Sequence, residues 1–104
     1  MMALVHLFRA LGDPSRLEMV KRLSRGASHT MSSLSKGLDI SRQGARKHLQ
    51  ILVDSKIITL VPKGRDTHVA LDMDTLDKGK NFIAKLELQW EKRLEALRDF
   101  VDGT

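Results

Sequence analysis

Basic and amide side chains gather between positions 41 and 50, where they could read the base edges of duplex DNA. We expect Arg42, Gln43 and Arg46 at base edges and Ser41 and Lys47 at phosphates. Arginine can donate two parallel hydrogen bonds to guanine, and glutamine can pair with adenine, in a major groove about 12 Å wide that admits an α-helix. The predicted DNA-binding set of this segment is Ser41, Arg42, Gln43, Gly44, Arg46, Lys47 and Gln50.

The same segment has an apolar side, which predicts a helix with one buried face. Ala45, Leu49 and Leu52 recur at helical spacing, and Ser41 stands where its side chain can cap the first turn. Gly44 would let this helix approach DNA closely, although glycine costs about 1 kcal/mol of helix propensity. The alternative is a solvated helix face that binds nothing.

Three helices are predicted before this one. The first covers 1–12, and Asp13 as N-cap with Pro14 at the first helical position begins a second helix that ends at Gly26. The apolar stripe of the second helix is Leu17, Val20 and Leu23. The polar stretch up to residue 30, with His29, is interpreted as a loop. A third helix of about two turns is predicted over 31–38.

The segment 31–54 therefore has helix-turn-helix order, and a β-hairpin is predicted after it over 57–71. Lys63 and Arg65 flank Gly64 at the predicted tip. They could reach a flanking minor groove or its phosphates. The alternative is that a tight turn simply favours solvated charges.

A long last helix is predicted over 75–102, because Leu76, Ile83, Trp90 and Leu97 repeat every seven residues. About 25 helical residues span roughly 37 Å, which exceeds what so small a body can cover. The surplus apolar stripe predicts a partner helix, and Trp90 is interpreted as a core or dimer contact. The predicted dimer contacts are Leu4, Leu7, Phe8, Leu76, Ile83, Leu86, Trp90, Leu94 and Leu97.

Composition fits one small domain that is mainly α with a small β-hairpin. The chain has 104 residues, of which 41% are hydrophobic and 30% charged. The first 71 residues hold 12 Lys and Arg against 5 Asp and Glu, whereas the remainder hold 6 against 8. This basic first part favours an acidic partner, and we expect double-stranded DNA.

Several function classes are excluded by what the sequence lacks. There is no cysteine, so thiolate catalysis, disulfides and thiolate metal sites are excluded. No motif for a nucleophile or a phosphate-cradling loop occurs, so neither an enzyme nor a cofactor is expected. No apolar run approaches the roughly 18 residues of a membrane span, and the start lacks a signal-peptide pattern. We expect a cytoplasmic protein without membrane contact.

Histidines and carboxylates do not form a spaced metal motif. His48 lies beside the apolar helix face and is interpreted as a packed, hydrogen-bonded residue, and the other histidines are His6, His29 and His68. Asp72, Asp74 and Asp77 could hold a hard cation, but acids at a helix N-terminus have a structural reason to be there. No metal site is predicted.

Three strings resemble the ArsR (ArsR/SmtB) family of bacterial transcriptional repressors. They are Phe8–Leu17, Ser41–Leu52 and Lys63-Gly64-Arg65. The resemblance implies a winged helix-turn-helix in which the first and last helices form a homodimer. Metal-sensing members commonly carry cysteines in the third helix or histidines in the last, and this chain has neither. Lys56 stands where the family often has glycine.

The expected function is a sequence-specific DNA-binding transcriptional regulator, a dimeric repressor that binds an inverted-repeat operator. Two alternatives stay open at this point. The same basic face could bind nucleic acid without reading bases, or the long helix could recruit another protein while the basic face is incidental. No residue set specifies an inducer.

Overall fold

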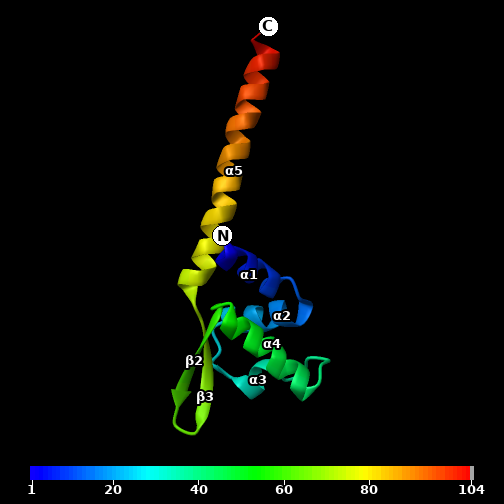
Figure 1. Cartoon of the computed structure of the whole chain (residues 1–104), viewed down its shortest axis with the longest axis vertical. Coiled ribbons are helices and arrows are strands. Elements are labelled where there is room, and N and C mark those ends of the chain that lie inside the picture. The colour runs from blue at the N-terminus through cyan, green and yellow to red at the C-terminus, as the bar shows by residue number, and fades with distance from the viewer. Residues whose placement is uncertain (104) are drawn as a thin grey trace.

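The computed structural model describes residues 1–103 and places five helices and three strands in that range. Their order is α1 (Met2–Leu11), α2 (Pro14–Ser24), β1 (His29–Thr30), α3 (Met31–Ser35), α4 (Arg42–Asp54), β2 (Ile58–Lys63), β3 (Asp66–Leu71) and α5 (Met73–Asp102). Helices α1 to α4 pack into a small body, the β2–β3 hairpin extends from one end, and α5 projects from the other (Figure 1). The molecule measures 70 × 26 × 26 Å. This is the predicted class, mainly helical with a small antiparallel sheet.

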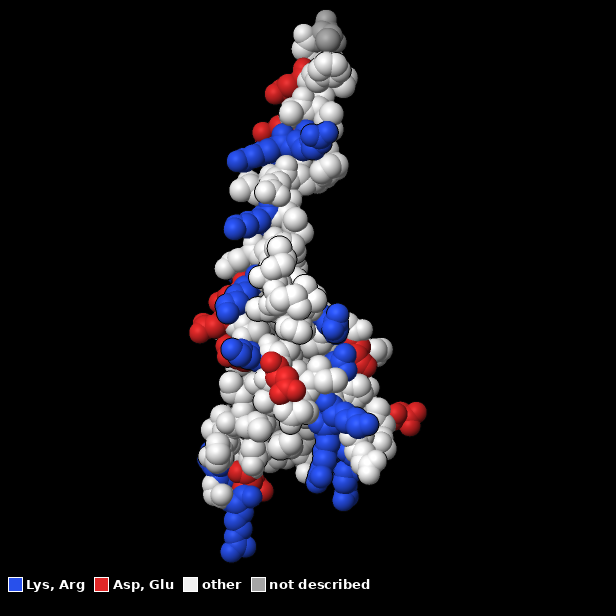
Figure 2. All heavy atoms as spheres, in the orientation of Figure 1, with Lys and Arg blue, Asp and Glu red and all other residues white. Residues whose placement is uncertain are grey.

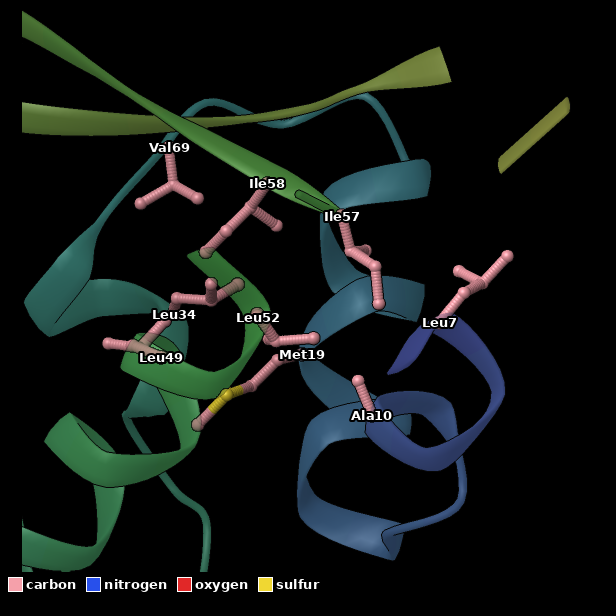
Figure 3. Packing of buried hydrophobic residues seen from close by; sticks show 9 residues of the cluster. All are labelled: Leu7, Ala10, Met19, Leu34, Leu49, Leu52, Ile57, Ile58 and Val69. Carbon is pink, nitrogen blue, oxygen red and sulfur yellow. The ribbon is translucent and has the colours of Figure 1, made fainter. Parts of the chain in front are cut away.

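The core joins every part of the body through one apolar cluster. Its buried members are Leu7, Ala10, Met19, Leu34, Leu49, Leu52, Ile57, Ile58 and Val69 (Figure 3). Met19 of α2 is fully buried and extends toward α4, whereas Leu17, which we predicted on the apolar stripe, is 45% exposed. Burying one such large side chain contributes about 1.5–3 kcal/mol, so this cluster fixes α4 against α2.

The start of α2 agrees with the prediction, whereas the end of α3 does not. Asp13 is the N-cap of α2 and Pro14 its first residue, as predicted, although the side chain of Asp13 makes no capping hydrogen bond. Helix α3 ends at Ser35, short of the predicted residue 38, and Gly37 adopts φ +83°. Nη1 of Arg22 donates to the carbonyls of Leu34 and Lys36 at 3.1 and 2.6 Å. These bonds satisfy carbonyls that further helical turns would otherwise have used.

The sheet has three strands in the order β1-β3-β2. His29 and Thr30, which we predicted in a loop, pair antiparallel with Val69 and His68 of β3. The hairpin turn is only Gly64 and Arg65, because Lys63 pairs with Asp66. Strand β2 therefore continues through Pro62, which an edge strand tolerates because its missing N–H need not pair.

Helix α4 ends in a turn that forces an unusual backbone angle on a lysine. Lys56 donates its N–H to the carbonyl of Val53 at 3.0 Å, and Ile57 donates to Leu52 at 3.0 Å. This pair of bonds is the Schellman arrangement, in which the left-handed position is usually glycine. Within residues 1–103, Lys56 is the one residue other than glycine with positive φ, at +62°.

The start of α5 packs tightly on α1. Asp72 caps α5 by accepting from the N–H groups of Asp74 and Thr75. A Cβ added at Gly79 would stand 2.7 Å from Cδ2 of Leu7, so any larger residue there would force the Leu7 side chain to shift. Leu7 is only 2% exposed in the single chain. It is therefore a core residue, and its predicted place among the dimer contacts is wrong.

Candidate nucleic-acid interface

Helix α4 presents one polar side to solvent and one apolar side to the core. Ala45, Leu49 and Leu52 are buried. The exposed members of the predicted set are Ser41, Arg42, Gln43, Arg46, Lys47 and Gln50. Because a helix repeats every 3.6 residues, the five that belong to α4 line one face. The structure thus brings the predicted polar side chains together on a surface that the body leaves open.

The first turn of α4 is held by its cap. Oγ of Ser41 accepts the N–H of Gly44 at 2.9 Å, as a serine N-cap usually does. A Cβ added at Gly44 would stand 3.1 Å from that same Oγ. Gly44 is half-buried, and its missing side chain leaves room for the capping hydroxyl of Ser41. Its predicted role in close approach to DNA stays a prediction.

A polar cluster of Arg16, His48 and Asp13 fixes the middle of α4 to the junction of α1 and α2. Arg16 donates from Nε to the carbonyl of Ala10 at 2.7 Å and from Nη1 to Nδ1 of His48 at 3.0 Å. Arginine offers only donors, so Nδ1 of this histidine is the acceptor in that hydrogen bond. Oδ2 of Asp13 is buried without a hydrogen bond and lies 3.8 Å from Nδ1 of His48. His48 is hydrogen-bonded, as predicted, and serves to position α4.

The basic side chains of α4 and of the hairpin tip have no acidic partner among the described residues, whereas the amide of Gln50 does. Within residues 1–103 no carboxylate pairs with the cations of this surface, which are Arg42, Arg46, Lys47, Lys63 and Arg65. Gln50, in contrast, donates from Nε2 to Oδ1 of Asp54 at 2.8 Å. Its amide is therefore partly committed inside the helix.

Sequence reasoning missed the contribution of α3. An open hollow of about 810 Å³ lies between α3 and α4, and hydroxyl groups of α3 and its cap line it beside Arg42 and Arg46. The residues missed are Thr30, Ser32, Ser33, Ser35 and Lys36. Ser32 and Lys36 are exposed there. Small hydroxyl side chains have no apolar periodicity, so the sequence pattern did not indicate them. The available signal was their position directly before the helix predicted to contact bases.

The hairpin tip carries Lys63 and Arg65 to the same end of the molecule as α4. Gly64 has φ +63° at the first central position of the two-residue turn, as in a type II′ turn. Figure 2 shows Lys and Arg atoms at the hairpin tip and over the α3–α4 region, both at the end opposite α5. The arrangement can place two sets of cations on one long polyanion.

Helix α5 leaves an apolar stripe open beyond the body. Leu86 and Trp90 are 50% and 57% exposed, and Phe8 of α1 packs against Phe82 with the rings tilted and their centroids 6.0 Å apart. The stripe continues with Ile83, Leu94 and Leu97, while Leu4 and Leu76 are half-buried at the junction of α1 and α5. The part of α5 that projects in Figure 1 carries most of this surface.

Other classes of site find little support in the described part of the chain. No group of three or more His, Cys, Asp or Glu side chains in residues 1–103 is placed to hold a metal ion. Asp72, which we considered for a cation, caps α5 instead. None of the described helices combines the length and the apolar character needed to span a membrane.

Comparisons with known proteins agree with this geometry. Residues 11–61 match a family model described as a helix-turn-helix domain, and no curated protein matches the sequence. The chain is 32% identical to an ArsR family transcriptional regulator of known structure, with 86% of this chain and 92% of the other covered and a TM-score of 0.78. It is 30% identical to an ArsR-like transcriptional regulator from Rhodococcus sp. RHA1, with 95% and 92% covered and a TM-score of 0.82. A homodimeric winged helix-turn-helix DNA-binding domain from Mycobacterium bovis shares the fold at 15% identity, with 89% and 82% covered and a TM-score of 0.61.

Proposed function

This chain belongs to the ArsR family of transcriptional regulators, and from that premise we propose that it is a dimeric repressor that binds an inverted-repeat operator. Family and fold are those of DNA-binding regulators and not those of enzymes. The proposal adds three properties to that class: readout of base sequence, assembly as a homodimer, and repression by blocking access of polymerase to the operator.

The observation that supports sequence readout is the open polar face of α4, whose cations have no acidic partner within residues 1–103. Arg42, Gln43 and Arg46 stand on its first two turns, and the N-terminal residues of a recognition helix usually contact base edges. Each good bidentate pair with a base discriminates by about 1–3 kcal/mol. We assign these three to bases and Ser41 and Lys47 to phosphates. The bond to Asp54 makes Gln50 the weakest member of the proposed set.

The hairpin is proposed as the wing. Lys63 and Arg65 are exposed at its tip, away from the core, and both are free of acidic partners among the described residues. We place them at a flanking minor groove or its phosphates, where a narrow A·T-rich groove concentrates negative potential. Gly64 keeps the turn short, so that the two cations stand at the very end of the strands.

The open apolar stripe supports the homodimer. A monomer rarely exposes a long contiguous apolar surface, and α5 repeats its apolar residues with the seven-residue period of helix pairs. The related domain from Mycobacterium bovis is described as homodimeric. With Leu7 removed, the proposed contacts are Leu4, Phe8, Leu76, Ile83, Leu86, Trp90, Leu94 and Leu97. A two-fold dimer then presents two α4 helices to half-sites about 34 Å apart.

Selection from a random duplex pool tests the proposal. The purified protein is titrated by fluorescence anisotropy at several salt concentrations, and the bound fraction is sequenced. We expect an inverted repeat and an affinity that falls steeply with salt. Binding without a motif would replace the proposal by non-specific nucleic-acid binding. Absence of binding at low salt would favour a protein-interaction module.

A further inference from the structure

A pocket lies where the start of α1, the end of α4 and the start of α5 meet, at the end of α4 opposite Arg42 and Gln43. Its volume is about 280 Å³. Each of the three helix ends supplies residues to the wall, and Figure 1 shows the three ends near one another. The residues used below are Ala3, His6, Leu7, Asp54, Lys56, Thr75 and Lys78. Nothing in the proposed DNA or dimer contacts uses this pocket.

The pocket combines two cations with an apolar wall. Lys56 follows α4 and Lys78 belongs to α5, and neither has an ion-pair partner in the described chain. The carboxylate of Asp54 also lines the pocket, but its Oδ1 already accepts from Gln50. Ala3 adds a small exposed apolar surface, and the nearly buried Leu7 lies behind it. Two lysines from separate elements that line one small space favour an anion there.

Polar groups that could orient an anion lie beside the two ammonium groups. Thr75 brings a hydroxyl from the first turns of α5, and His6 brings an imidazole from α1. By helical spacing, Ala3 and His6 share one side of α1, whereas the proposed dimer contacts Leu4 and Phe8 lie on another. The pocket side of α1 is therefore different from the side that we assign to the dimer.

The backbone at Lys56 gives a second reason to look for a ligand. The Schellman turn after α4 needs a residue with positive φ, and glycine satisfies that need without steric cost. This chain instead has lysine there, at φ +62°. Unfavourable backbone conformations outside glycine cluster at ligand-binding and switch regions. The turn itself does not require an ammonium group, whereas an anion in the pocket does.

We propose that this pocket binds a small organic acid, with its carboxylate at Lys56 and Lys78 and its apolar part against Ala3. The volume is at the lower limit of ligand pockets and fits a molecule of about ten non-hydrogen atoms. Thr75 and His6 supply the remaining hydrogen-bonding groups. An inducer role rests on the proposed function: the ligand would contact the end of the DNA-reading helix and both helices of the dimer at once.

The test uses the full ¹⁵N-labelled chain without DNA, so that its outcome does not depend on the proposed function. Benzoate, acetate and inorganic phosphate are titrated separately, and amide chemical shifts are followed. The variants are Lys56→Gly and Lys78→Gln, with Lys80→Gln as a matched control because Lys80 is exposed on α5 outside the pocket. Lys56→Gly removes the cation and relieves the turn, so a loss of binding in this variant does not reflect unfolding.

We expect benzoate to cause saturable shifts at His6, Lys56, Thr75 and Lys78, with weaker binding of acetate. Each pocket variant should weaken benzoate about tenfold, as for loss of a charged hydrogen bond, and Lys80→Gln should change it less than twofold. Three outcomes would overturn the proposal: no saturable shift with any anion, shifts spread over the basic surface of α4, or equal binding by Lys56→Gly. Saturation by phosphate alone would overturn the assignment to an organic acid.

A benzoate-dependent change in DNA affinity is measured last. If benzoate binds the pocket but leaves the affinity for the selected duplex unchanged, the site stands and its inducer role fails. If no duplex is selected at all, the proposed function fails while the pocket result stands on its own.

Discussion

Lys47→Ala should lower the salt dependence of operator binding by an amount that the geometry fixes. Lys47 is exposed on α4 and lacks an acidic partner within the described residues. The logarithm of the binding constant falls with the logarithm of the salt concentration by about 0.9 for each phosphate neutralised. The cations that we place at phosphates are Lys47 and, in the wing, Lys63 and Arg65, and a two-fold dimer brings each of them twice. The expected slope is therefore about −5 for the unmodified protein.

Replacing Lys47 in both copies removes two of these contacts, so the slope should become shallower by about 1.8. Fluorescence anisotropy with the selected duplex between about 50 and 200 mM salt measures it. Lys85→Ala removes the same charge from the exposed surface of α5 and should leave the slope unchanged. Equal slopes for Lys47→Ala and the unmodified protein would refute the placement of α4 on phosphates. An equal change in Lys85→Ala would show that net charge alone is responsible.

Three further changes test the fold and the dimer. Lys56→Gly should raise the free energy of unfolding by about 1 kcal/mol, because it relieves a left-handed lysine; thermal melting checks this, and Lys36→Gly, at φ −63°, should not stabilise. Trp90→Glu should yield monomers in sedimentation while retaining the melting temperature. Leu88 is similarly exposed, at 53%, but lies off the stripe, so Leu88→Glu should stay dimeric. The same oligomeric state for both variants would contradict the proposed interface. Arg16→Ala should cost about 2 kcal/mol in urea unfolding, because it leaves carbonyl and imidazole acceptors unpaired; a loss under 0.5 kcal/mol would contradict this estimate.

Local patterns were sufficient to predict α4 and most of the hairpin. The alternation of apolar and polar residues around Ala45 and Leu49, and the Ser41 cap, lie within a few turns of one helix. Hydrophobic periodicity reports such a segment directly. The turn residues around Gly64 likewise marked the hairpin, although β2 and β3 extend closer to the tip than expected. The sequence also indicated that α5 has more apolar surface than the body covers.

Features that depend on distant partners were missed or wrong. Strand β1 has only two residues, too few for an alternating pattern, and it exists because β3 offers a free edge. Leu7 has the spacing of an apolar helix face, but spacing does not distinguish burial against the chain's own α5 from burial against another copy. In the structure Leu7 packs against Gly79 of α5, which leaves room for the leucine side chain. The pocket joins His6, Lys56 and Lys78, whose separations along the chain form no motif.

The readout of bases by α4 is tested most directly by repeating the duplex selection with Arg46→Ala. The side chain of Arg46 is exposed on the polar face of α4 and makes no hydrogen bond or ion pair in the described residues, so its loss should leave the fold intact. We expect the inverted repeat to persist but to lose its base preference at one position in each half-site, symmetrically. An unchanged motif, or a uniform loss of affinity with all preferences retained, would contradict base reading by this helix face.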